Sequence, residues 1–453
     1  MTMKTIKSRK KLALYGCSGL GVNMLNIVVG SYLCSALLIG GFDKHIESWT
    51  YLNCDLVVAG LWAVFVFFAK ALDGIIDLPL ASFADRLKTK LGRRKTAILI
   101  GFIPMIVAYL LFLIPINKSA TVLNTVWFGV ILCIFYTSYT LTMLTYYATF
   151  SEVTDNERDA LFLSNSKSIC DVVYFSLGFA LIPLFVSLGI NIRIVALIFL
   201  PLCLSMIIPF LLLDESADGE GLENRTLTLP TALKTSFENK SFIIWMSAAF
   251  VMTIGLQLFL GGINELFSST GLNMTLVMAS SFAPVPLTIM VYNKITKTYG
   301  LGIGYRYVLV VYTLGMIIMY FCNINSDKLS NLWLTLIAIL GGIFVSFAIG
   351  AFFSITYTVP TSLAKAEFER TGKTVATMYF AVEGLFEGIA AGIATGFILV
   401  NLKAHDVISL LPIIVAICCA VAFGISFVFP KSIKELGKGV SSAKAEKRVE
   451  ETV

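Results

Sequence analysis

Residues 55–83 read DLVVAGLWAVFVFFAKALDGIIDLPLASF, a long apolar run. The charged residues in its interior are Lys70, Asp73 and Asp77, and Pro79 is its one proline. About 20 mainly apolar residues are enough for a helix to cross a bilayer. We therefore predict a membrane-spanning helix here. Its charged residues become the first functional candidates, because an ionised side chain at mid-bilayer costs about 2.5 to 3.5 kcal/mol on insertion scales.

Similar apolar runs recur along the whole chain. It has 453 residues, of which 57% are hydrophobic and 14% are charged, whereas a soluble domain carries about 25% charged residues. The mean hydropathy is +0.85. The sequence therefore predicts an all-α membrane protein with twelve transmembrane helices. We expect these helices at about 12–41, 55–83, 96–116, 124–150, 168–188, 192–213, 242–267, 274–292, 305–324, 332–358, 375–400 and 407–429.

The distribution of basic residues predicts the orientation. Of the 34 Lys and Arg residues, 28 fall at the termini and in every second connection, and Lys70 lies inside a helix. The other connections hold five, which are Lys44, Lys118, Arg193, Lys328 and Lys403. By the positive-inside rule we expect a multi-pass protein of the cell membrane with both termini in the cytoplasm. Anionic lipid headgroups suffice to explain the net charge of +6, so we do not expect a nucleic-acid partner.

The sequence lacks the patterns of common enzymes. The nine cysteines contain no C-x-x-C spacing and lie mostly in apolar runs, so we expect them to be packing residues. The two histidines fall in short polar stretches, which argues against a histidine-ligated metal or a catalytic triad. No cofactor motif is found. We therefore expect neither enzymatic activity nor a cofactor.

An internal repeat divides the chain. Residues 79–92 resemble residues 286–300, and residues 145–158 resemble residues 356–370, at a nearly constant offset. We expect a six-helix half at 1–213, a central cytoplasmic loop at 214–241, a second six-helix half at 242–430 and a cytoplasmic tail at 431–453. Two such halves in pseudo-two-fold repeat predict a carrier with a midplane site that is exposed alternately to each side.

Acidic residues dominate the polar content of the predicted helices. Lys70, Asp73 and Asp77 share one face of the second helix, with Trp62 continuing that face. The eleventh helix adds Glu383 and Glu387, with Tyr379 one turn before them. An ion pair between Lys70 and Asp73 could serve packing alone. However, one lysine cannot neutralise four acids, so they should bind protons, a metal cation or a cationic substrate.

Other polar residues have two interpretations. Lys167 and Asp171 are spaced for a partly solvated salt bridge, which we favour over a role as a gate strut. Asn23 and Tyr146 could hydrogen-bond a hydroxylated ligand, but such side chains also join membrane helices to one another. We take the following as candidate substrate-binding residues: Asn23, Trp62, Lys70, Tyr146, Tyr379, Glu383 and Glu387.

The stretch 73–94, DGIIDLPLASFADRLKTKLGRR, resembles the glycoside-pentoside-hexuronide:cation symporters, the melibiose-permease-like branch of the major facilitator superfamily. Both acids, Asp85-Arg86 and the Gly-Arg-Arg at 92–94 match the family pattern, and the proline is one place later. Residues 11–23 and 146–158 and the basic residue Lys167 add weaker support.

The resemblance implies a two-domain major-facilitator fold that couples uptake of a sugar or glycoside to Na⁺, Li⁺ or H⁺, with Asp73 and Asp77 binding the cation. It also implies a cytoplasmic salt-bridge network. The alternative is that these charged residues are simply solvated in loops. This network would comprise Asp85, Arg86, Arg93, Arg94, Glu152, Arg158, Lys167 and Arg370.

Three departures affect the substrate more than the coupling. Asn23 stands where sugar carriers can have an acid, Met143 and Thr145 replace an acid and a proline, and Glu383 reverses the charge of a family lysine. We therefore expect a secondary transporter, functional as a monomer in the bilayer, that moves a small hydroxylated solute with a cation. The alternative is a proton-driven exporter of an amphipathic or cationic compound; lysolipid transport and a non-transporting receptor are less supported.

Overall fold

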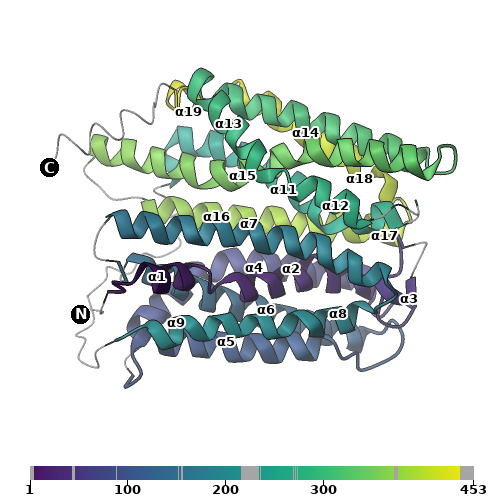
Figure 1. Cartoon of the computed structure of the whole chain (residues 1–453), viewed down its shortest axis with the longest axis horizontal. Coiled ribbons are helices and arrows are strands. Elements are labelled where there is room, and N and C mark those ends of the chain that lie inside the picture. Colours follow the sequence, from purple (N-terminus) through teal and green to yellow (C-terminus); the bar gives the residue numbers. More distant parts are fainter. Residues whose placement is uncertain are drawn as a thin grey trace. The chain divides into compact units, whose positions relative to one another are not determined.

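The structure, a computed structural model, describes residues 5–42, 46–87, 89–151, 153–154, 157–215, 234, 236–268, 270, 272, 274–371 and 376–438, and every regular element within them is helical (Figure 1). The helices before the central connection are α1 (Arg9–Gly16), α2 (Leu20–Ile27), η1 (Val28–Leu33), η2 (Ser35–Leu37), α3 (Ile46–Trp49), α4 (Ala59–Arg86), α5 (Arg93–Phe112), α6 (Val122–Ala148), η3 (Thr149–Ser151), α7 (Glu157–Ser187), α8 (Ile192–Phe199), η4 (Leu200–Met206) and α9 (Ile207–Leu212).

The helices after it are α11 (Lys240–Ser268), α12 (Met274–Phe282), α13 (Val285–Tyr299), α14 (Leu301–Ile324), α15 (Asn331–Thr371), α16 (Ala376–Gly392), η5 (Ile393–Leu399), α17 (Val400–Ala404), η6 (Ile408–Leu410), α18 (Leu411–Ser426) and α19 (Lys431–Lys434). Within the described residues, twelve helical segments are long and apolar enough to cross a membrane. They confirm the all-α fold class and the twelve predicted spans.

These segments follow the predicted spans closely. They are Arg9–Leu37, Ala59–Asp77, Arg93–Phe112, Val122–Ala148, Ile169–Ser187, Ile192–Leu212, Lys240–Ser268, Thr275–Tyr299, Leu301–Ile324, Asn331–Phe352, Val382–Ala404 and Ile408–Ser426. The second and tenth continue as helix beyond the apolar stretch, in α4 to Arg86 and in α15 to Thr371. Apolar length thus identifies the span, but a helix ends only where its backbone hydrogen bonding ends.

The chain forms two compact units. Unit 1 comprises Met1–Leu229, Leu260–Thr275 and Gly384–Ile408, and unit 2 comprises Pro230–Phe259, Leu276–Glu383 and Ser409–Val453. In unit 1, α5 packs along α6, and α6 also packs on α4. In unit 2, α14 packs against α15 and α18. The division into six-helix halves at residues 213 and 242 remains a prediction.

Two glycines at equivalent landmarks of the repeat share one backbone conformation. Gly92 has φ 95° and ψ 154° directly before α5, and Gly300 has φ 91° and ψ 163° directly before α14. Both lie in the positive-φ region that glycine adopts readily. The carboxylate of Glu215 caps α5 by accepting the backbone N–H groups of Arg94 and Lys95, each at 3.0 Å. An acid at this position also favours the positive end of the helix dipole.

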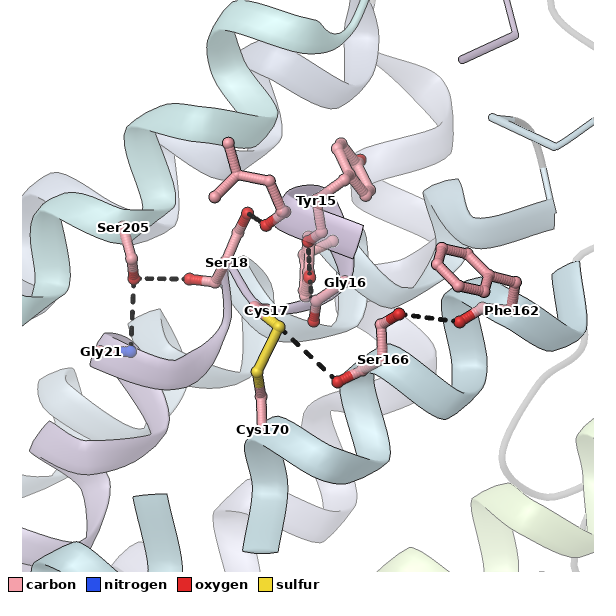
Figure 2. Close-up of a disulfide and its surroundings, with 11 residues drawn as sticks. Tyr15, Gly16, Cys17, Ser18, Gly21, Phe162, Ser166, Cys170 and Ser205 are labelled. Atoms are coloured by element: carbon pink, nitrogen blue, oxygen red, sulfur yellow. Dashed lines mark hydrogen bonds between the residues drawn. A yellow bond between two sulfur atoms is a disulfide. The ribbon is translucent and has the colours of Figure 1, made fainter. Parts of the chain in front are cut away.

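The first span is interrupted and cross-linked. A turn separates α1 from α2, where the Ser205 hydroxyl donates to the Ser18 carbonyl at 2.6 Å and accepts the N–H of Gly21 (Figure 2). Cys17 in this turn forms a disulfide with Cys170 of α7, with the two Cα atoms 5.5 Å apart. The expectation that all cysteines only pack is therefore wrong for these two. Sequence spacing could not reveal the pair, since 153 residues separate them.

Candidate functional site

The charged face of α4 lies inside unit 1 and carries Lys70, Asp73 and Asp77, all partly buried. The Thr140 hydroxyl of α6 donates a hydrogen bond to Asp73 Oδ1. No ion pair joins Lys70 to Asp73, although both residues are among those described. The simple packing explanation for this stripe, an internal Lys70–Asp73 salt bridge, is therefore not what the structure contains.

Helix α4 meets the later part of α16 through small residues. A Cβ on Gly388 would lie 2.6 Å from the Lys70 carbonyl oxygen, and a Cβ on Gly74 would lie 2.8 Å from the Cα of Leu385. Beside this crossing, Asp77 Oδ2 lies 3.2 Å from the position of a Cβ on Gly384. The absence of side chains on these glycines lets the two backbones approach closely, which is a common arrangement between membrane helices.

Two carboxylates of unit 1 have no fixed partner among the described residues. Asp77 on α4 and Glu387 on α16 are both partly buried. Within the described part of the chain, neither makes an ion pair or a hydrogen bond. Since charge is costly at membrane depth, such groups are favourable only when a mobile positive species can reach them.

The aromatic and amide candidates of unit 1 form a hydrogen-bonded cluster. Asn23 accepts a hydrogen bond from the Tyr139 hydroxyl at 2.8 Å and donates one to the Tyr147 hydroxyl at 3.3 Å. The Tyr146 hydroxyl instead donates to the backbone carbonyls of Tyr15 and Gly16 at the break between α1 and α2. Tyr146 thereby satisfies backbone carbonyls at the break between α1 and α2. Asn23 instead belongs to a polar cluster with Tyr139 and Tyr147.

The remaining candidates on α16 belong to unit 2. Glu383 is 4% exposed and accepts a hydrogen bond from the Trp245 indole N–H at 3.3 Å. Tyr379 is stacked on Phe242, with ring centroids 4.3 Å apart, and its hydroxyl accepts a hydrogen bond from the Asn239 amide at 2.8 Å. Both side chains thus contact residues at or near the start of α11.

The structure describes three of the predicted gate residues. Lys167 pairs with Asp171 at 2.6 Å, and both side chains are about one-fifth to one-quarter exposed, at 24% and 22%. This confirms the predicted partly solvated salt bridge. Arg93 and Arg94 open α5, and Arg94 is buried. Glu152 and the side chains of Asp85, Arg86, Arg158 and Arg370 lie outside the described residues.

The sequence did not predict the buried ion pair between Lys403 and Glu265. Lys403 of α17 donates to Glu265 Oε1 at 2.9 Å, to the Ser35 carbonyl at 2.7 Å and to the Ser35 hydroxyl at 2.9 Å. Lys403 is 2% exposed and Glu265 is fully buried. The assignment of Lys403 to a connection between spans is therefore wrong, because it lies within α17. The polar residues around it suggested a loop, but helix continues to Ala404 and turns the lysine inward.

The comparison with known families decides the class of protein. A family described as MFS/sugar transport protein matches residues 14–423, which is nearly the whole chain. The chain belongs to the MFS/sugar transport protein family. With its twelve spans, it is therefore a multi-pass membrane transporter of the major facilitator type. No curated protein matches its sequence.

Solved structures similar to this family member are also transporters. The nucleoside transporter NupG aligns with a TM-score of 0.64 and 15% identity, covering 95% of this chain and 100% of its own. A POT family transporter in complex with a thioalcohol-conjugated peptide aligns with a TM-score of 0.63 and 14% identity. The alignment covers 92% of this chain and 95% of that transporter. A bacterial homologue of the human lysosomal transporter Spinster aligns with a TM-score of 0.58 and 12% identity. The alignment covers 94% of this chain and 99% of the homologue. At these identities the likeness shows the fold alone.

Proposed function

We propose that this MFS/sugar transport family member is a cation-coupled symporter of a sugar, glycoside or similar small hydroxylated solute, working by alternating access. Na⁺ or H⁺ would be the coupling ion, no further cofactor would take part, and one copy would suffice. The match of residues 73–94 to the glycoside-pentoside-hexuronide:cation symporter pattern supports this finer assignment.

The single observation that carries the coupling proposal is the lack of fixed partners for Asp77 and Glu387 in the described part of unit 1. A carboxylate held at membrane depth without a cationic or hydrogen-bonding partner is destabilising. A visiting cation or proton removes that cost during part of the cycle. When the site is open to one side of the membrane, its cation occupancy follows the cation concentration on that side. This difference in occupancy is the thermodynamic basis of symport.

Asp73 would act beside Asp77 in this scheme. It lies one turn earlier on α4, and the Thr140 hydroxyl already orients its carboxylate. Carboxylate and hydroxyl oxygens are hard ligands suited to small hard cations. Asn23, with its two tyrosine partners, would supply hydrogen bonds for solute hydroxyl groups.

The test is solute flux into proteoliposomes that contain the purified protein. We expect an inward Na⁺ or H⁺ gradient to drive accumulation of at least one member of a broad sugar panel. If no solute moved faster under either gradient, the symport proposal would be wrong.

Matched variants locate the coupling. In Asp73→Asn/Asp77→Asn the acids lose their charge with little change in shape, and we expect the cation dependence of flux to disappear. Asp327→Asn, which changes an exposed aspartate in the turn after α14, should behave as the parent protein. Unchanged cation dependence in the double variant would exclude these acids as the coupling site.

An exporter of cationic compounds stays a prediction from Glu383 and Glu387. Acidic residues around a cavity would favour such a substrate, but the small cavity described in unit 1 has lysines and no acid among its lining residues.

A further inference from the structure

Unit 1 contains a small cavity with two lysines in its lining. Its walls include Ser35, Trp62, Lys70, Tyr136 and Lys403, and its volume of about 20 Å³ is enough for about one water molecule. Two lysines and no carboxylate are among its lining residues, all of which the structure describes. A water-sized cavity with this composition favours a small negative group.

Lys70 contributes an ammonium group to the lining of this cavity. Its ammonium group lies 4.1 Å from the centroid of the Tyr136 ring. Among the described residues, no acceptor forms a hydrogen bond or an ion pair with this group, although a lysine ammonium has three N–H donors. A cation–π contact of this kind is worth about 0.5 to 2 kcal/mol, which is less than a buried charge requires.

A second donor faces the same space. The Tyr136 hydroxyl is buried and has no hydrogen-bond partner among the described residues, and the side chain is 1% exposed. Buried polar atoms without partners are uncommon in native structures and call for a ligand or water. Lys70 and Tyr136 therefore offer one charged and one neutral donor to a single occupant.

The other lysine of the cavity is already balanced. The Lys403 ammonium makes three hydrogen bonds, to Glu265 and to two oxygens of Ser35, and Glu265 is not among the lining residues. The Lys403–Glu265 pair is thus neutral as a whole. Asp73, one turn along α4, attracts the Lys70 ammonium electrostatically. It is absent from the lining, however, and among the described residues it accepts no hydrogen bond from Lys70.

Gly30 keeps the space between the two donors open. A Cβ at this position would lie 3.0 Å from the Tyr136 hydroxyl oxygen and 3.7 Å from Lys70 Nζ. Gly30 lies in η1, a π-helical segment, and the lining also includes Thr395 and Leu399 of the π-helical η5. Single π-helical turns within α-helices often accompany functional sites.

We propose that this cavity binds an anionic group, with the Lys70 ammonium and the Tyr136 hydroxyl as its donors. The group is either a free halide such as chloride or a carboxylate of the transported solute. The second source rests on the proposed symport function and deepens it, because a solute with one negative charge would move with one cation without net charge transfer.

The experiment measures thermal unfolding of the purified protein in detergent, at constant Na⁺ concentration and with bulky 2-(N-morpholino)ethanesulfonate as the background anion. Ligand binding to the folded state raises the unfolding temperature. Stabilisation by chloride assigns the site to a free halide, and stabilisation by glucuronate but not glucose assigns it to an acidic solute. Stabilisation by neither anion overturns the proposal and leaves water as the occupant.

Three variants test the donors. Lys70→Met removes the charge at similar length, and we expect the apparent anion affinity to fall about 10- to 100-fold, as for the loss of a charge-assisted hydrogen bond. Gly30→Ala retains both donors but fills the space beside them, and it should also weaken binding. Lys118→Met, an exposed lysine elsewhere, should leave the affinity unchanged. Parent-like affinity in both Lys70→Met and Gly30→Ala would overturn the assignment to this cavity.

The outcomes separate the two proposals. Cation-driven flux of neutral sugars without anion stabilisation would refute the anion site and retain symport. Anion stabilisation lost in Lys70→Met, with flux that ignores every cation gradient, would support the anion site and refute symport.

Discussion

Lys403 and Glu265 form the best-buried ion pair described in unit 1. Removing both charges from such a pair is often close to neutral, whereas removing one leaves the other uncompensated and costs about 3 to 5 kcal/mol. The same reasoning applies to Asp77 and Glu387, which have no fixed partner among the described residues; under the proposed symport, the coupling ion would supply their compensating charge.

A double-mutant cycle tests this ion pair. We expect Glu265→Gln and Lys403→Met each to lower the unfolding temperature in detergent, and the combined variant to recover most of the loss because neither charge remains. Additive losses in the combined variant would show that the two side chains are not energetically coupled.

Asp73 and Asp77 could be singled out from the sequence because long apolar stretches flank them, and their role in cation binding stays a prediction. Sequence reasoning failed for Lys403, whose neighbours Asn401, His405 and Asp406 resemble a solvated connection. The partner Glu265 lies 138 residues away in the chain, and no local pattern connects them. Hydropathy averages over a window, so it cannot tell an inward-facing lysine at a helix end from an exposed one.

At the scale of helices, α4 and the continuous helix formed by α16 and η5 pack through glycines at every fourth position. Beyond Gly384 and Gly388, a Cβ on Gly392 would lie 2.9 Å from the Phe67 carbonyl oxygen, and one on Gly396 would lie 2.7 Å from that of Ala63. Spacing of four residues aligns them along one helix face. The close packing holds the carboxylate of Asp77 directly beside α16.

Adding a methyl group to this interface should push the helices apart. We expect Gly388→Ala to lower stability by about 1 to 3 kcal/mol, the usual cost of overpacking, and to reduce transport. Gly60→Ala is the matched control on α4, because nothing lies within 4 Å of a Cβ there. It should be neutral or slightly stabilising, since alanine favours helix more than glycine does. Equal unfolding temperatures for the two variants would contradict the interface.

The glycine pattern was visible in the sequence, but its role was not. Gly384, Gly388, Gly392 and Gly396 would have this spacing in any helix. Which helix they face depends on tertiary packing. The repeat was more informative, because Gly92 and Gly300 occupy matching positions before long helices and have matching dihedral angles.

For the whole molecule, the family and the twelve spans establish a multi-pass transporter, while the distribution of basic residues predicts its orientation. Hydropathy identified the spans well because every backbone polar group in a bilayer must be satisfied internally, which requires complete helices. The disulfide between Cys17 and Cys170 was missed because it depends on which spans are neighbours.

Labelling of single cysteines tests the orientation. Lys90 and Lys118 are exposed at opposite ends of α5, so they should lie on opposite sides of the membrane. In a background without native cysteines, we expect Lys118→Cys to react with a membrane-impermeant maleimide in intact cells and Lys90→Cys to react only after lysis. The reverse pattern would invert the predicted topology.

The π-helical segment η5 separates Glu387 from Lys403 along one continuous helix. An α-helix turns by about 100° per residue, and a π-helical turn contains more residues than an α-helical one. The angle around the helix axis between these two charged residues is therefore set by the backbone conformation rather than by the side chains. A homologue that lacked one residue here would present its terminal lysine in a different direction, even if every aligned letter were identical.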